Sequence, residues 1–202
     1  MLETSILNAQ IDDQYISNNN FENELLKGID ISRIEFESVQ FIGCEFDNCN
    51  FTKASFYNSS FINCNFSNCN FTDSYWKKSE ILNCKGDGGN FSHSHIKESK
   101  LSDSSFCYAI YSESVWENCT IYNCSFKNAF FSEVKLKKLD LTEVNFNNVD
   151  FFKTQLKGID LSACDIGGIM VSDTYRELKG AKISPLQAVD IVHLLGVKIN
   201  QY

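Results

Sequence analysis

The feature of this sequence that most restricts its fold is a large apolar residue that returns every five positions. The series begins at Ile6 and continues to Val171 without a shift of register. Of its 34 members, 33 are large and apolar, whereas apolar residues make up 43% of the chain. Fifteen of the 17 Phe and both Trp fall in this register, and the one exception is Gly86. A regularity of this length indicates one continuous repeat.

A second column, of small residues, lies two positions before the first. Between Val39 and Thr154 it has 24 members, and 23 of them are Ala, Ser, Cys, Thr, Val or Gly. A period of five matches neither the 3.6 residues of a helical turn nor the alternation of a strand. It requires a backbone that turns inward once every five residues, so that four sides close a square coil of about 20 residues. We therefore expect a solenoid whose coils hydrogen-bond to one another like strands of a sheet.

The repeat resembles the pentapeptide repeat family, whose pattern is A(D/N)LXX. Cys49–Thr52, Cys64–Ser67 and Cys69–Thr72 carry it plainly, each as Cys-Asn-Phe followed by a hydroxyl residue. The resemblance covers roughly residues 16 to 171 and implies an all-β fold, a right-handed quadrilateral β-helix. We expect this β-helix to occupy residues 1–175, with regular coils from about residue 16. Residues 176–202 are expected to form a C-terminal helix and tail that cap the rod and dimerise it.

Eight of the nine cysteines lie in the small column, which explains their number without disulfides. There Cys acts as a small apolar residue that points into the core. Members 20 residues apart, such as Cys44, Cys64 and Cys84, would stack at about 4.8 Å, which is also within reach of a disulfide. A disulfide or a metal site therefore remains an alternative, but Ala and Ser fill the same column elsewhere. The segment Gly86–Gly89 keeps the register, and the sequence leaves open whether it forms a bulge or a projecting loop.

A different pattern begins after Val171. Ser184, Pro185 and Gln187 indicate a helix start with a capping box, and Gly196 suits the helix end. The helix between them is apolar on nearly every side, so the end of the rod can cover only part of it. We expect a second copy of the chain to cover the rest in a two-fold dimer; a monomeric cap is the alternative. The expected interface residues are Leu186, Val189, Ile191, Val192, Leu194 and Leu195.

This tail also resembles the quinolone-resistance branch of the family, the Qnr and MfpA type. The residues that carry the resemblance are the segments 156–162 and 178–181, the Pro-Leu-Gln-Ala helix start and Leu194–Gly196. The resemblance implies a dimer that binds DNA gyrase or topoisomerase IV, imitates a DNA duplex and protects the enzyme from fluoroquinolones. Several Qnr-type proteins project a loop that touches the enzyme, and the unbroken repeat here shows no such insertion.

Charged residues are spread unevenly over the four walls of such a coil. Counting in chain order, wall one is centred on Phe46 and the residues 20 positions from it, wall two on Phe51, wall three on Phe56 and wall four on Phe61. Walls one, two and four carry net charges of −2, −5 and −5, and wall three carries +3. We expect a basic partner to contact the acidic walls; the alternative is that the charge serves solubility. The candidate contact residues are Asp73, Glu113, Glu133 and Asp150 on wall two and Glu80, Asp103, Asp140, Glu143 and Asp160 on wall four.

Other classes of function are not supported by the residues. The three histidines are scattered, and neither a phosphate-binding loop nor a zinc spacing is present, so we expect no enzyme, cofactor or small-molecule substrate. The net charge of −8 disfavours direct nucleic-acid binding. Without an apolar run or a signal peptide, we expect a cytoplasmic protein with no membrane segment. Two hypotheses remain: a topoisomerase-binding protector, and a structural or adaptor rod with an unidentified protein partner.

Overall fold

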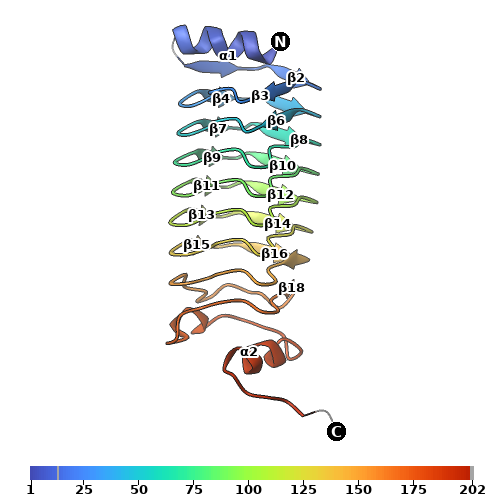
Figure 1. The fold of residues 1–202 in the computed structure, drawn as a ribbon, viewed down its shortest axis with the longest axis vertical. Helices are drawn as coiled ribbons and strands as arrows, with labels where there is room; N and C mark the ends of the chain where they lie inside the picture. The colour runs from blue at the N-terminus through green and yellow to red at the C-terminus, as the bar shows by residue number, and fades with distance from the viewer. Residues whose placement is uncertain (13, 201–202) are drawn as a thin grey trace.

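The chain forms a straight rod of stacked square coils with a helix at each end (Figure 1). This computed structural model describes all residues except 13, 201 and 202. Helix α1 (Leu2–Ile11) lies across one end, and α2 (Ala188–Leu194) lies at the other, after a short 3-10 helix η1 (Arg176–Leu178). The coils between them confirm the quadrilateral β-helix that the period of five predicts.

Parallel strands from successive coils pair along the walls, and each pairs with the residue 20 positions on, as Phe36 does with Phe56. Wall three is a sheet of seven strands: β1 (Tyr15–Ser17), β4 (Glu35–Glu37), β7 (Ser55–Tyr57), β9 (Tyr75–Lys77), β11 (His95–Lys97), β13 (Val115–Glu117) and β15 (Lys135–Lys137). Wall four is a second sheet of seven: β2 (Asn20–Glu22), β5 (Gln40–Ile42), β8 (Ser60–Ile62), β10 (Glu80–Leu82), β12 (Lys100–Ser102), β14 (Thr120–Tyr122) and β16 (Asp140–Thr142). Wall one holds the pairs β3 (Leu25–Lys27) with β6 (Glu45–Asp47) and β17 (Val144–Asn145) with β18 (Cys164–Asp165), and wall two is joined by single bridges from Asp30 to Met170.

The two columns of the sequence build the interior. Aromatic rings of successive coils stack face to face along the axis, with ring centroids 4.5 Å apart for Phe51 and Phe71. The small column lines the inner corners, where Ser79 Oγ donates to the carbonyl of Phe56 at 3.0 Å and Cys44 Sγ donates to that of Phe21 at 3.3 Å. Because Cys and Ser make the same contact, they are interchangeable in this column. All nine cysteines are free thiols, and eight of them are buried.

A third column, which the sequence analysis missed, forms the outer corners. Every fifth residue, two positions after the axial one, has a positive φ in nearly all coils, for example 52° at Asn48 and 67° at Gly88. This left-handed conformation is disfavoured for most side chains and least so for Gly and Asn. The signal was in the sequence, because Asn or Gly occupies many of these positions. Corner side chains point off the edges of the rod, and Asp73, Asp103, Glu113, Glu133 and Glu143 are all corner residues.

Gly86–Gly89 forms neither a bulge nor a projecting loop. The N–H groups of Gly86 and Gly88 donate to the carbonyls of Ser105 and Cys107 at 2.8 Å, as in any other coil. Gly86 leaves space on the axis, and the rings of Phe66 and Phe106, from the coils on either side, fill it. Their centroids lie 6.3 Å apart. A Cβ at Gly86 would lie 2.6 Å from Phe66 and 2.9 Å from Phe106.

We expect Gly86→Phe to destabilise the protein, although it restores the repeat pattern. Both neighbouring rings would have to move, and overpacking of this kind costs about 1–3 kcal/mol. Urea unfolding monitored by circular dichroism measures the loss. Ile81→Phe, which places the Phe common in this chain's axial column one wall earlier, is the comparison. A Gly86→Phe protein as stable as the unchanged chain would contradict the proposed packing.

The hydrogen-bond ladder is interrupted near the C-terminal end of wall three. Among the described residues, no backbone hydrogen bond joins 134–138 to 154–158, and β15 and β16 are the last strands of their sheets (Figure 1). Leu139, the one bulky residue of the small column between Val39 and Thr154, lies at this corner, and it and Leu136 are only partly buried. The bulk of Leu139 does not by itself explain the separation, because Ile34 occupies the same column, is buried, and accepts the N–H of Ser55 at 3.0 Å in an intact ladder. We refer to this place as the seam.

The first end cap was not foreseen. Ile6 and Ile11 continue the apolar period of five, but both lie in α1 rather than in a coil. Leu2, Ile6 and Ala9 are buried against the first coil, whereas Ile11 is exposed. Their spacing of four and three residues is that of an amphipathic helix, and the coincident period of five concealed it.

The second end cap follows the sequence signals closely. The N–H of Ser184 donates to Gln187 Oε1 at 2.7 Å and the N–H of Gln187 donates to Ser184 Oγ at 3.4 Å, which is the predicted capping box, one turn before α2 as bounded here. At the other end Gly196 has φ 76°, and its N–H donates to His193 while the N–H of Val197 donates to Val192. These bonds form a Schellman motif that ends the helix.

Candidate protein-interaction surfaces

Wall four presents the longest row of free carboxylates. Glu80, Asp103, Asp140, Glu143 and Asp160 are all exposed, and none forms an ion pair with a described residue. The structure adds Lys182 to this wall, where it forms a bridge with Asp160, so the expected net charge of −5 becomes −4. Hydrogen bonds from Ser162 lower the pKa of Asp160, and nearby Lys182 adds to the effect. The wall therefore carries negative charge along its length.

A shallow groove runs along the edge between walls four and one. It is lined by corner residues from Asn63 to Glu143 and by outward residues of wall one down to Asp165. The corner side chains are fixed by hydrogen bonds between coils: Asn123 Nδ2 donates to Asp103 Oδ1 at 2.8 Å and Asn83 Nδ2 donates to Asn63 Oδ1 at 2.7 Å. Two of the wall-four carboxylates, Asp103 and Glu143, thus border a surface with a defined shape.

Wall two is less acidic than the sequence assignment suggested. Asp12 caps α1 and Asp173 lies in the irregular segment after Val171, whereas Asp13 lies outside the described residues. The coils of this wall keep five acidic and three basic residues, a net charge of −2. Two of the candidate carboxylates are engaged there: Glu133 with Lys153 at 3.0 Å and Glu113 with His93 at 3.7 Å.

Wall two carries instead an apolar patch that the sequence analysis did not single out. Phe130, Phe152 and Met170 are 44%, 41% and 48% exposed and lie around Asp150, which bridges to Phe130 and Met170. Lys153 Nζ lies 5.1 Å from the centre of the Phe152 ring. These two Phe are the only ones outside the axial column, which is the signal that could have revealed them.

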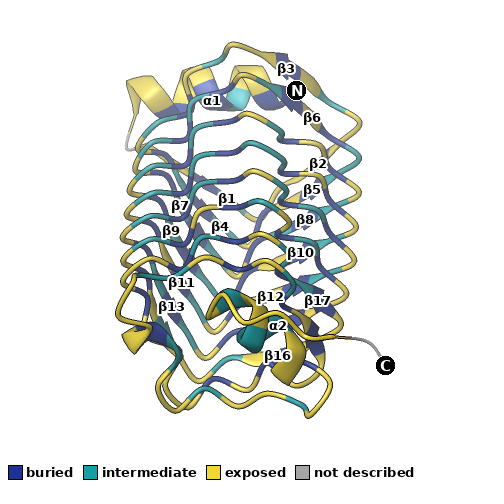
Figure 2. Cartoon of the chain, turned by 60° about the horizontal axis from the view of Figure 1, so that its bottom comes forward, coloured by how far each residue is buried: buried dark blue, intermediate teal, exposed yellow. Residues whose placement is uncertain are grey.

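The C-terminal cap also exposes apolar side chains. Ile191 and Leu194 pack against the end of the core and Val192 is partly buried, whereas Leu186, Val189 and Leu195 are 87%, 45% and 49% exposed. Figure 2 shows α2 across this end of the rod, with no fully buried residue in the helix. The six expected interface residues therefore divide between the rod and the solvent.

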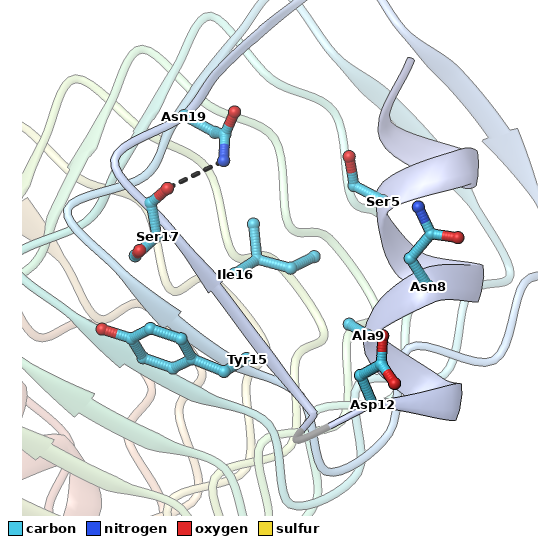
Figure 3. A pocket seen from close by; sticks show the side chains of 8 residues that line it. All are labelled: Ser5, Asn8, Ala9, Asp12, Tyr15, Ile16, Ser17 and Asn19. Carbon is cyan, nitrogen blue, oxygen red and sulfur yellow. Dashed lines mark hydrogen bonds between the residues drawn. The ribbon is translucent and has the colours of Figure 1, made fainter.

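The structure brings no set of catalytic side chains together among the residues it describes. The cleft between α1 and β1 (Figure 3) is lined by Ser5, Asn8, Asp12, Ser17 and Asn19 beside Ile16, and contains no nucleophile next to a base. Burial raises the pKa of the Cys124 thiol to about 12 and that of Cys164 to about 11, so these thiols stay protonated near neutral pH. The described residues include no cluster suited to a metal ion. Within the same part of the chain, no helix is long and apolar enough to cross a membrane.

Square coils stacked around an aromatic axis define a solenoid of the class built from short sequence repeats. The repeats match two family models, described as the pentapeptide repeat region (residues 34–111 and 54–131) and as pentapeptide repeats (8 copies; residues 131–168). The chain belongs to the pentapeptide repeat family.

Solved structures of QnrB1, whose description is a plasmid-mediated fluoroquinolone resistance protein, share this architecture. One trypsin-treated variant superposes with a TM-score of 0.56 at 19% identity, covering 91% of this chain and 100% of QnrB1. Another gives a TM-score of 0.47 at 21% identity, covering 92% and 95%. At this identity the likeness shows the fold alone. A search of curated protein sequences gave no match.

Proposed function

We propose that this protein binds a type II DNA topoisomerase, DNA gyrase or topoisomerase IV, through its acidic walls and protects the enzyme from fluoroquinolones by partial imitation of DNA. The observation that carries the proposal is the row of unpaired carboxylates on wall four beside a shaped groove. A rod with this charge fits a basic, DNA-binding saddle on a protein. The C-terminal resemblance to the Qnr and MfpA type and the shared fold with QnrB1 support the choice of enzyme.

The charge density limits how far the imitation extends. Eight coils at about 4.8 Å make a rod of about 38 Å. Four net charges over that length give one per roughly 10 Å, against one per ~1.7 Å in duplex DNA. Shape must therefore supply much of the affinity, and the electrostatic part should weaken as salt is added.

A DNA-supercoiling assay with gyrase and a decatenation assay with topoisomerase IV, each in the presence of ciprofloxacin, test the proposal. We expect the protein to restore activity, and to do so less well at higher salt. Reversing Glu80, Asp140 and Glu143 to Lys should raise the protein concentration needed at least tenfold, which corresponds to about 1.4 kcal/mol. The matched reversal of Asp73, Glu113 and Glu133 to Lys changes the net charge by the same amount and should cost less than threefold, with circular dichroism to compare the folds of the two variants. If the protein neither rescues nor inhibits gyrase, and has no effect on topoisomerase IV either, the proposal is overturned.

The second candidate function is an adaptor rod, favoured by the apolar patch of wall two. Exposed aromatic side chains ringed by charge are common at the energetic centres of protein interfaces. In an adaptor that uses this wall, Phe130→Ser with Phe152→Ser would abolish partner binding, and the wall-four reversals would leave it unchanged. If the protein is instead a topoisomerase protector, the wall-four reversals should reduce activity in the topoisomerase assay more than the two Phe→Ser changes do. The two variants therefore separate the hypotheses.

A homodimer through the C-terminal cap is part of the same proposal. The exposed apolar residues of the cap extend from Ile183 and Leu186 to Val197 and Ile199, and a second copy related by a two-fold axis would cover them. Light scattering after size exclusion should give about twice the 23.0 kDa of one chain. Leu186→Asp with Leu195→Asp should give a folded monomer, because both residues face away from the rod. If the unchanged protein is monomeric, the dimer proposal is wrong and the cap only covers the end of the rod.

A further inference from the structure

Wall three carries a cluster of lysines near its C-terminal end. Lys135, Lys137 and Lys138 belong to β15 and its corner, Lys157 lies one coil further on, and Lys179 precedes Gly180, whose carbonyl accepts the N–H of Gly158 at 2.8 Å. All five are exposed. None forms an ion pair within the described residues, whereas Lys27, Lys85, Lys97 and Lys153 all do. We call these five residues the lysine cluster.

The surroundings of the lysine cluster leave its charge uncompensated. The segments 134–138 and 154–158 contain no acidic residue, and the carboxylate of Glu177, which stacks beside Leu156, is buried and accepts from the N–H of Lys153 and the hydroxyl of Ser172. Glu117, one coil above, is engaged by Lys97 at 3.7 Å, and Glu133 on the neighbouring wall is engaged by Lys153. Like charges on adjacent strands repel one another, and the cluster spans the seam, where backbone hydrogen bonds between the coils are lost. An anion bound across the seam would relieve this repulsion.

The chemistry of the face indicates what kind of anion fits. The centres of protein–protein interfaces are depleted in Lys and enriched in aromatic side chains. No large apolar side chain of β9, β11, β13 or β15 is among the strongly exposed residues of the described chain. A flat face of flexible ammonium groups in rows about 4.8 Å apart suits a line of phosphates, which in duplex DNA follow one another at about 3.4 Å along each strand.

We propose that the lysine cluster binds the phosphate backbone of a nucleic acid, without regard to sequence. The net charge of −8 does not prevent this, because charges more than about 10 Å away are largely screened at 0.1 M salt. Wall three lies at right angles to walls two and four in the square coil, so the acidic walls stay free when it is occupied. The inference goes beyond topoisomerase binding and does not depend on it.

Fluorescence anisotropy with a labelled 20-base-pair DNA duplex tests the proposal on the full chain. If five lysines contact phosphates, the logarithm of the binding constant should fall with that of the salt concentration with a slope of about −4.5, so that affinity drops by two to three orders of magnitude between about 50 and 200 mM salt. Changing all five lysines of the cluster to Gln should weaken binding at low salt at least tenfold and bring the slope close to zero. A labelled single strand of the same length shows whether the duplex form matters.

The matched control changes five lysines elsewhere to Gln: Lys27, Lys53, Lys85, Lys127 and Lys153. It alters the net charge by the same amount and should weaken DNA binding by less than about threefold, because phosphate contacts rather than net charge set the affinity. Circular dichroism confirms that both variants are folded. Equal losses in the two variants, no binding by the unchanged protein at low salt, or binding of labelled poly-glutamate in preference to DNA would each overturn the proposal.

Discussion

Replacing Phe106 with Ala is expected to lower the free energy of unfolding by about 3–5 kcal/mol, towards the upper end of that range. Phe106 is fully buried and fills two levels of the axis, its own and that of Gly86. The cavity left by Ala would therefore extend from Phe66 to Phe126, whose ring stacks on Phe106 at 5.3 Å. Urea unfolding followed by the fluorescence of the buried Trp76 and Trp116 measures the effect.

Phe126→Ala is the matched control for this prediction. Phe126 is equally buried but has an aromatic ring in the coil on each side, Phe106 and Phe146. It should cost about 1 kcal/mol less than Phe106→Ala, because the cost of a cavity grows with its volume. The double variant Gly86→Phe with Phe106→Ala should recover stability relative to Phe106→Ala alone, since the new ring enters the vacated space. If the two changes add as independent losses, the packing assigned to Gly86 is wrong.

Replacing Glu177 with Ala is expected to loosen the last coil, at a cost of about 2–4 kcal/mol. This carboxylate is buried, with 2% of the residue exposed, and accepts the N–H of Lys153 at 2.9 Å and the hydroxyl of Ser172 at 2.9 Å. In the preceding coil the N–H of Glu133 donates to the carbonyl of Phe152. The irregular segment after Val171 removes the equivalent carbonyl from Lys153, and Glu177 replaces it. Limited proteolysis and amide exchange of residues 150–182 measure the loosening.

The effect of Glu177 should depend on pH. Burial would raise the pKa of this carboxyl, but hydrogen bonds from its own N–H, from Ser172 and from the N–H of Lys153 hold the pKa below its ordinary value. Its contribution is therefore complete above the unfolded-state pKa of about 4.3 and is lost as the pH falls through the lower folded pKa. The difference in melting temperature between the unchanged chain and Glu177→Gln should shrink over that acidic range. An unchanged difference down to pH 2 would contradict the role of Glu177.

The candidate surface was only partly predictable from the sequence. Wall membership follows from counting, so the sequence alone places the carboxylates of wall four on one face. Counting could not show that Glu113 and Glu133 are engaged by His93 and Lys153, since that depends on side-chain reach between coils. It also could not remove Asp12 and Asp173 from wall two, because their positions depend on where the coils begin and end. Ion pairs and rod ends therefore decided which wall is the stronger candidate.

The sequence by itself determined the coil, its four walls, the inward cysteines and both ends of α2, because each depends on residues close in the chain or at a fixed spacing of five. Only the tertiary structure showed how the coil at Gly86 is packed, since rings 20 residues away on either side fill the space that its missing side chain leaves. The same holds for the seam at Leu139 and for the carboxylate of Glu177, where contacts between coils replace the local pattern. It also showed that the first residues form a helix, because burial against the first coil outweighs a coincidental period of five.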